Sequence, residues 1–138
     1  MKSIVIIGSG ARECAILMKL AQSKEFTSYD IFTISTFKNP YMAVKSNYIV
    51  VKDLSYDTLT HLDIFETLAT EAVKAVEAPK AIVFIGPENP ITDGFADFLH
   101  KRHIKCIAPT KEHAMIESSK GYTRDLLNKN NLTKYNPR

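Results

Sequence analysis

The chain has 138 residues, 45% of them hydrophobic, which predicts one compact domain with a sizeable core. Its 18 Lys and Arg against 15 Asp and Glu give a net charge of +3. That excess is too small for a nucleic-acid surface, although it favours an anionic small molecule. No apolar run approaches the length of a membrane span and no signal peptide is recognisable, so we expect a cytoplasmic protein whose two cysteines are reduced.

The first motif is a short apolar run that ends at a glycine-rich turn. Residues 4–7 are β-branched without interruption, which suits a strand that is buried on both faces. Gly8 and Gly10 then allow a tight turn and close approach of a ligand. A helix is predicted directly after them, and its free N–H groups and positive dipole end favour an anion. We therefore predict an anion at this turn, with a tight turn that binds nothing as the alternative.

Strands and helices alternate along the rest of the chain. A helix is predicted from the glycine turn to about Ser23. An amphipathic helix is predicted from Phe65 to Val76, with Pro79 as its stop. Four further strands are predicted at residues 29–34, 47–51, 81–85 and 105–108.

The remaining segments are predicted to be loops and helix starts. Residues 37–40 and 86–90 contain prolines, and the second of these loops is expected to be neither strand nor helix. Caps of the last three helices are expected among Thr92, Asp93, Thr110, Ser118 and Ser119. The alternation predicts the α/β class, with an open, mostly parallel five-stranded sheet and helices on both faces. This Rossmann-like domain is expected to span residues 1–128.

Several kinds of site are disfavoured by particular residues. Glu13 stands where a dinucleotide fingerprint needs Gly or Ala, and Ser35 and Thr36 stand where it needs an acidic residue. A dehydrogenase is therefore disfavoured, and the absence of Gly-Lys-Ser/Thr after the glycines excludes a P-loop. His100 and His103 have a metal-like spacing, but they lie at a basic helix end, where a surface role is favoured.

Polar residues follow the carboxyl ends of several predicted strands, the edge at which α/β sheets bind ligands. Arg12 could pair with a phosphate, whereas Glu13 and Glu88 could accept hydrogen bonds from an amine or from sugar hydroxyls. Lys38 and Asn39, after the second strand, could reach a ligand at the same edge. The alternative for these side chains is a solvated role, or for Glu13 a role as partner of the helix dipole.

Three motifs occur together, in order and at fitting distances. They are Gly8-Ser9-Gly10-Ala11-Arg12-Glu13-Cys14-Ala15, Gly86-Pro87-Glu88-Asn89-Pro90-Ile91 with Gly94, and Pro109-Thr110 with Ile116-Glu117-Ser118-Ser119-Lys120. With these motifs the chain resembles the N-terminal domain of phosphoribosylamine–glycine ligases, which are ATP-grasp enzymes of purine biosynthesis. The segment Lys38-Asn39-Pro40 resembles their archaeal-type branch.

The resemblance implies an ATP-dependent ligase that joins glycine to 5-phosphoribosylamine through glycyl phosphate. It implies that this chain holds part of the phosphoribosylamine site, and that ATP and magnesium bind mainly to ATP-grasp domains outside it. The chain alone is then expected to be inactive, and residues 129–138 are expected to begin the linker to those domains. Substrate is expected to contact Gly8, Ser9, Gly10, Arg12, Glu13, Asn39, Glu88 and Pro90. The nucleotide phosphates are expected to contact Lys120.

Two residues depart from the family pattern. Ala11 stands where the family usually has glycine, and Cys14 stands where it usually has histidine. The expected partners are 5-phosphoribosylamine, glycine and the ATP-grasp domains, without nucleic acid or membrane. The alternative function is a stand-alone module that binds a nucleotide or metabolite and has no ligase activity.

Overall fold

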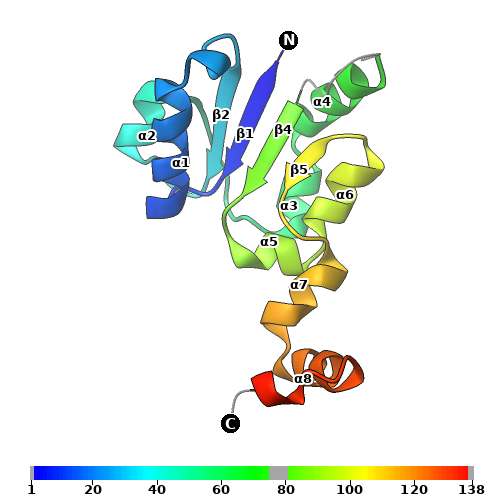
Figure 1. The fold of residues 1–138 in the computed structure, drawn as a ribbon. Coiled ribbons are helices and arrows are strands. Elements are labelled where there is room, and N and C mark those ends of the chain that lie inside the picture. Colours follow the sequence, from blue (N-terminus) through cyan, green and yellow to red (C-terminus); the bar gives the residue numbers. More distant parts are fainter. Residues whose placement is uncertain (1, 75–80, 137–138) are drawn as a thin grey trace.

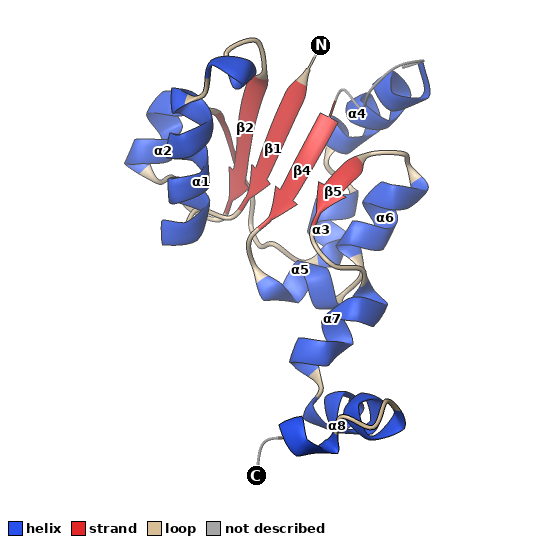
Figure 2. Cartoon of the chain, in the orientation of Figure 1, coloured by secondary structure: helices blue, strands red, loops and turns tan. Residues whose placement is uncertain are grey.

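In the computed structural model of the chain, which describes residues 2–74 and 81–136, five strands form one sheet between two sets of helices (Figures 1 and 2). The strands are β1 (Ser3–Ile7), β2 (Asp30–Ser35), β3 (Asn47–Val50), β4 (Ala81–Ile85) and β5 (Lys105–Ile107). The α-helices are α1 (Ala11–Gln22), α2 (Pro40–Lys45), α3 (Tyr56–Thr60), α4 (Asp63–Lys74), α5 (Glu88–Thr92), α6 (Phe95–Lys101), α7 (Lys111–Ser118) and α8 (Lys120–Lys129). Two short 3₁₀ helices are η1 (Lys24–Phe26) and η2 (Thr133–Tyr135).

The five strands are all parallel and lie in the order β3-β2-β1-β4-β5, which confirms the predicted fold class. Ile7 at the end of the central strand β1 lies level with Ile34 on β2 and with Ile85 on β4. The three strands therefore finish at the same edge of the sheet. The strand order reverses next to β1, and α/β sheets bind ligands at such a reversal, beyond the carboxyl ends of the strands.

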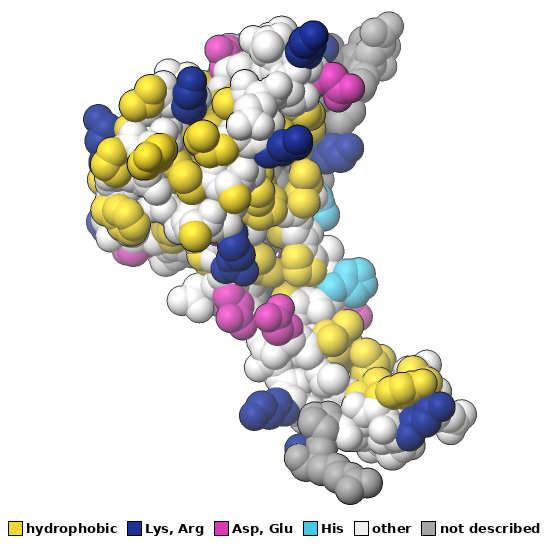
Figure 3. Space-filling model, turned by 60° about the vertical axis from the view of Figure 1, so that its left-hand side comes forward, with side chains coloured by type: hydrophobic (Ala, Val, Ile, Leu, Met, Phe, Trp, Pro, Cys, Tyr) yellow, Lys and Arg dark blue, Asp and Glu magenta, His cyan; other side chains and the backbone are white. Residues whose placement is uncertain are grey.

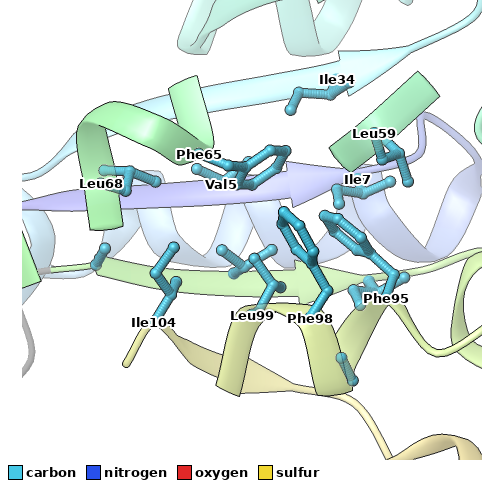
Figure 4. Close-up of a cluster of buried hydrophobic side chains, with 14 residues drawn as sticks. Val5, Ile7, Ile34, Leu59, Phe65, Leu68, Phe95, Phe98, Leu99 and Ile104 are labelled. Carbon is cyan, nitrogen blue, oxygen red and sulfur yellow. The ribbon is translucent and has the colours of Figure 1, made fainter. Parts of the chain in front are cut away.

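The sheet has a hydrophobic core on each face, because successive side chains of a strand point to opposite sides. Val5 and Ile7 of β1 belong to one core, in which they pack with residues of α4 and α6 (Figure 4). Ile4 and Ile6 belong to the other core, with Leu17 of α1 and Met42 of α2. Residues 3–7 are all buried, as predicted for a strand that is covered on both faces.

Two segments that were predicted to be loops contain helices. Pro40 is the first residue of α2, and the prediction that residues 86–90 are not helical was wrong, because α5 begins at Glu88. Pro90 is tolerated there because the N–H groups of a first helical turn have no partner within the helix. Asn39 is extended, as expected for the residue before a proline, and it caps α2.

The start of α6 also differs from its prediction. Neither Thr92 nor Asp93 caps the helix; the cap position is held by Gly94, which has a φ of 92°. This left-handed conformation favours glycine, which explains the residue at this turn. Thr110 and Ser119 cap α7 and α8 as predicted. The predicted helix end at Val76 and Pro79 lies outside the described residues.

The surface of α2 carries apolar side chains in addition to the one that it buries. Met42 is fully buried, whereas Tyr41 and Val44 are 73% and 80% exposed. Figure 3 turns the side with α1 and α2 forward and shows hydrophobic side chains gathered there. The helix α2 therefore presents apolar groups both to the sheet and to the solvent.

The last two helices lead away from the sheet (Figures 1 and 2). No residue of α8 is buried, and this helix contacts mainly α7 and η2. Among the residues that are described, no helix is long and apolar enough to span a membrane. Cys14 and Cys106 are free thiols, and burial raises the pKa of Cys106 to about 12.

Candidate functional site

Two glycine-containing loops meet at the carboxyl edge of the sheet. One follows β1 and contains Gly8 and Gly10, and the other follows β4 and begins at Gly86. The Gly86 N–H donates to the carbonyl oxygen of Ile7 at 3.0 Å. Gly8 has a φ of 108°, which a residue with a side chain rarely adopts. The two loops therefore lie side by side at the reversal of strand order.

The Glu13 side chain fills the space between these loops. It is 5% exposed, although it belongs to the first turn of α1. A Cβ atom added to Gly86 would lie 1.8 Å from Glu13 Oε1, and one added to Gly10 would lie 2.8 Å from Oε2. A Cβ on Gly8 would lie 3.1 Å from the carboxyl carbon. The carboxylate therefore packs directly against three glycines, and at position 86 only glycine leaves room for it.

The Glu13 carboxylate has no hydrogen-bond donor among the described residues. Within residues 2–74 and 81–136, no side chain or backbone N–H donates a hydrogen bond to Glu13, and no Lys or Arg forms an ion pair with it. Among the described residues the buried side-chain atoms without a partner are Ser3 Oγ and Asn136 Oδ1, so the Glu13 oxygens keep contact with solvent and are open to a partner. The Glu13 carboxylate is therefore suited to accept hydrogen bonds from a ligand that brings an amine or hydroxyl groups.

A cavity of about 260 Å³ opens beside the same loops. Its lining includes Gly86, the Arg12 side chain from α1, Glu88 from α5 and Glu117 from α7. Arg12 forms no ion pair with any described residue, so its guanidinium is available to an anion. The cavity thus combines a cation with two carboxylates, a set that suits a ligand with both an anionic group and hydrogen-bond donors.

Ser9 and Asn39 lie at the same edge but are engaged within the protein. The Ser9 and Ser35 hydroxyl oxygens lie 2.6 Å apart, and both residues are buried. Asn39 Nδ2 donates to the Ser9 carbonyl oxygen at 3.0 Å, and Asn39 Oδ1 accepts from the Tyr41 N–H at 3.0 Å. The structure therefore brings these two predicted residues to the glycine loop, where they contact each other.

Pro90 and Lys120 do not line the 260 Å³ cavity. Pro90 is buried and lines a second cavity, of about 470 Å³, together with Pro87 of the same segment and Asp53 from the loop after β3. Lys120 is exposed at the start of α8, on the far side of α7 from the sheet. The predicted site residues therefore fall into three groups. Gly8, Gly10, Arg12, Glu13 and Glu88 lie at the glycine loops or line the 260 Å³ cavity, Ser9 and Asn39 contact each other, and Pro90 and Lys120 lie outside that cavity.

Asp53, in the second cavity, is held by three hydrogen bonds. Its Oδ1 accepts from the Ser55 N–H at 3.1 Å, the Ser55 hydroxyl at 2.5 Å and the Thr58 hydroxyl at 2.6 Å. These bonds, those from the side chains of Ser55 and Thr58 first, lower the pKa of Asp53 to about 2. Asp53 thus braces the start of α3, whose cap is Ser55.

Glu117 is a site residue that the sequence analysis did not select. It lies within the third family motif, three positions before Lys120, so the motif itself was the available signal. Its position in the chain is far from Arg12 and Glu88, and only the packing of α7 against α5 and α6 brings it to their cavity. Among the described residues, no group of three or more His, Cys, Asp or Glu side chains could hold a metal ion.

Comparison with known proteins identifies the family. The family model described as "Phosphoribosylglycinamide synthetase, N domain" matches residues 2–117. The chain belongs to this family. The matched region contains both glycine loops and the whole lining of the 260 Å³ cavity, and it ends before α8.

Curated relatives of this synthetase N domain are much longer than the chain. The phosphoribosylamine–glycine ligase of Methanococcus vannielii is 33% identical over 129 residues, which cover 94% of this chain and 26% of the relative. The ligase of Methanocaldococcus jannaschii is 34% identical, with the same shares covered. A trifunctional purine biosynthetic protein of Chironomus tentans is 32% identical, over 91% of this chain and 8% of its own length. The chain therefore spans about a quarter or less of these relatives.

Proposed function

We propose that this chain is the N-terminal domain of a ligase that joins glycine to 5-phosphoribosylamine with ATP, and that it holds part of the phosphoribosylamine site. The main support is the Glu13 side chain, which is 5% exposed and lies against Gly8, Gly10 and Gly86, and whose carboxylate accepts no hydrogen bond from the described residues. A sugar phosphate with an amine and hydroxyl groups would supply that donor. Family membership and the printed names of the relatives support the reaction.

The start of α1 and the 260 Å³ cavity, which Arg12 and Glu88 line and Glu13 does not, suit the other groups of such a substrate. The first hydrogen bond of α1 is donated by the Cys14 N–H to the Gly10 carbonyl oxygen. The N–H groups of the residues before Cys14 therefore have no partner within the helix. These N–H groups and the unpaired Arg12 guanidinium suit the phosphate. Glu88, in the same cavity as Arg12, suits a ribose hydroxyl. One end of the site thus attracts an anion and the other accepts hydrogen bonds.

ATP, magnesium and glycine are proposed to bind mainly to parts of the polypeptide outside these residues. Lys120 would reach toward the nucleotide phosphates, and its exposed position at the start of α8 leaves it free to do so. Residues 1–128 would form the domain and residues 129–138 would begin the connection to the ATP-grasp region. The proposed setting is the cytoplasm, and the chain alone is expected not to catalyse the ligation.

The proposed binding site is tested by titrating the chain with ribose 5-phosphate, a stable relative of the amine substrate. Backbone amide resonances are expected to shift at residues 8–13, at Gly86 and at Glu88. Replacing Arg12 by Ala removes the cation of the cavity and should weaken binding about tenfold, the scale of one charged hydrogen bond. Arg124 is exposed on α8, so Arg124→Ala is the matched control and should leave affinity unchanged. Equal affinity of both variants would contradict the proposed site.

The proposed reaction is tested in the complete polypeptide. ADP is expected to form only when ATP, glycine and 5-phosphoribosylamine are present together. Equal rates with a different amine or amino acid would contradict the ligase assignment. Binding of ribose 5-phosphate without any turnover would instead support a metabolite-binding module.

A further inference from the structure

The glycine loop after β1 is held from one side by β2 and the segment that follows it. The Gly8 N–H donates to the Ile34 carbonyl oxygen at 2.9 Å. The Ser9 hydroxyl lies 2.6 Å from the Ser35 hydroxyl, and the Ser9 carbonyl oxygen accepts from Asn39 Nδ2 at 3.0 Å. Three successive polar groups of the loop are thus tied to the same neighbouring segment.

The other three polar atoms of Asn39 are held as well, the carbonyl oxygen by the Ala43 N–H at 2.9 Å. Its Oδ1 accepts from the N–H groups of Tyr41 and Met42, at 3.0 and 3.4 Å, and so caps α2. Its backbone N–H donates to the Tyr48 hydroxyl at 3.0 Å, and that hydroxyl donates to the Phe37 carbonyl oxygen at 2.8 Å. A chain of contacts therefore runs from β3 through Asn39 to the glycine loop.

The bond from Asn39 to Ser9 sets the direction of the next peptide group. In a trans peptide the C=O and the following N–H point in opposite directions. Because the Ser9 carbonyl is drawn toward Asn39, the Gly10 N–H points away from it. This N–H donates no hydrogen bond within the described part of the chain. On the other side of β1 lies β4 with Gly86, where the Glu13 carboxylate sits.

We propose that Asn39 is a positioning residue, which orients the glycine loop for ligand binding by holding the Ser9 carbonyl and does not itself contact the ligand. The inference rests on the proposed phosphoribosylamine site. Loss of the Asn39 Nδ2 donor would free the peptide between Ser9 and Gly10 to rotate. The N–H groups at the start of α1 would then lose part of their fixed geometry, which a preorganised site needs for affinity.

Two variants distinguish the effect of the Asn39 bond to Ser9 from the effect of Asn39 as the N-cap of α2. Asn39→Asp and Asn39→Ser both keep an oxygen that can cap the helix, since Asp and Ser are good N-cap residues. Both remove the amide donor to Ser9. Asp adds a negative charge and Ser does not, so an effect that is common to both variants is not electrostatic repulsion of the phosphate.

The matched control is Asn47→Asp. Asn47 is an exposed residue on β3 whose Nδ2 donates to the Ile31 carbonyl oxygen at 3.4 Å. The chemical change is the same as in Asn39→Asp, and it occurs away from the carboxyl edge of the sheet. This control measures how affinity and hydrogen exchange respond when an asparagine elsewhere in the chain loses its amide donor.

The measurements are affinity for ribose 5-phosphate, the thermal unfolding midpoint, and amide hydrogen exchange of residues 9–13 in the free chain. Both Asn39 variants are expected to bind about tenfold more weakly, the loss that one hydrogen bond of typical strength can cause. Their amides at residues 9–13 should exchange faster, while those of β1 and of the α2 interior stay unchanged. Asn47→Asp should match the wild type in affinity and exchange.

Several results would overturn the inference. They are unchanged affinity in Asn39→Ser, weaker binding by Asn39→Asp alone, or a fall in unfolding midpoint with no change in exchange at residues 9–13. A wild-type chain that does not bind ribose 5-phosphate would contradict the proposed function. In that case the exchange measurement, which needs no ligand, still tests whether Asn39 holds the loop.

Discussion

At the scale of single residues, the Glu13 carboxylate is the group on which the site depends. It is buried against the glycines of both loops, yet no described residue donates a hydrogen bond to it. A ligand that donates to this carboxylate therefore breaks no hydrogen bond of the free protein. Substitution of Glu13 should therefore separate binding from stability.

Glu13→Gln keeps the shape of the side chain and removes its charge. Affinity for ribose 5-phosphate should fall between about tenfold and a hundredfold, as expected for a hydrogen bond to a charged group. The thermal unfolding midpoint should change little, because no described residue donates a hydrogen bond to the carboxylate. Glu112→Gln, at an exposed position of α7, is the control. A lower midpoint at unchanged affinity would show instead that Glu13 is structural.

The lowered pKa of Asp53 predicts that the free energy of unfolding depends on pH in the acid range. Its pKa is lowered from 3.8 to about 2 by hydrogen bonds from Ser55 and Thr58. A carboxyl whose pKa is lower in the folded state stabilises fully above the unfolded value and loses this contribution as the pH falls through the folded value. The free energy of unfolding should therefore decrease between pH 3.8 and about 2. In Asp53→Asn this part of the decrease should be absent; equal slopes would contradict the assignment.

At the scale of elements, the two loops after β1 and β4 form one unit through Gly86. A methyl group at position 86 would lie 1.8 Å from Glu13 Oε1, so the Glu13 side chain must leave its place between the loops if the glycine is replaced. The unit therefore joins α1 to α5 across the sheet edge. Glycine is needed at position 86 because any side chain there would occupy the place of the Glu13 carboxylate.

Gly86→Ala should displace the Glu13 side chain. It is expected to destabilise the chain by about 1–3 kcal/mol, the usual effect of overpacking, and to weaken binding of ribose 5-phosphate. Gly121 is the matched control, because a Cβ there meets no atom within 4 Å. Gly121→Ala should stabilise α8 by up to about 1 kcal/mol. Thermal unfolding of the two variants measures the contrast, and similar midpoints would contradict the packing argument.

At the scale of the whole molecule, the sheet with its two cores is separate from the C-terminal extension. All five strands and the helices α1 to α6 contribute to the body, whereas α8 has no buried residue and contacts mainly α7 and η2. The family match ends at residue 117, close to the end of α7. The extension is therefore expected to unfold or to be removed with little effect on the body.

Removal of residues 119–138 tests this separation. The unfolding midpoint of the remaining chain should change by no more than about 4 °C, which corresponds to roughly 1 kcal/mol for a domain of this size. Circular dichroism at a helix wavelength measures both the midpoint and the loss of α8. A fall of more than about 10 °C would mean that α8 belongs to the cooperative unit of the sheet.

Much of the fold was predictable because its signals are local. The β-branched run at residues 4–7 and the helical spacing after Phe65 each predict one element from its own side-chain pattern. The helices at Pro40 and Glu88 were missed because proline is read as a helix breaker, although it fits a first turn. Gly94 replaced the expected cap because a left-handed turn precedes α6.

The α/β class, the glycine turn after the first strand and the departure of Glu13 from a dinucleotide fingerprint can all be read from the chain without its fold. Each of these follows from residues that are neighbours in the chain. Three other features depend on the folded chain. The Glu13 carboxylate packs against Gly86, Glu117 lines the same cavity as Arg12 and Glu88, and the Asn39 amide donates a hydrogen bond to the Ser9 carbonyl oxygen. These contacts join segments far apart in the chain, and they exist only because parallel strands bring their carboxyl ends to one edge.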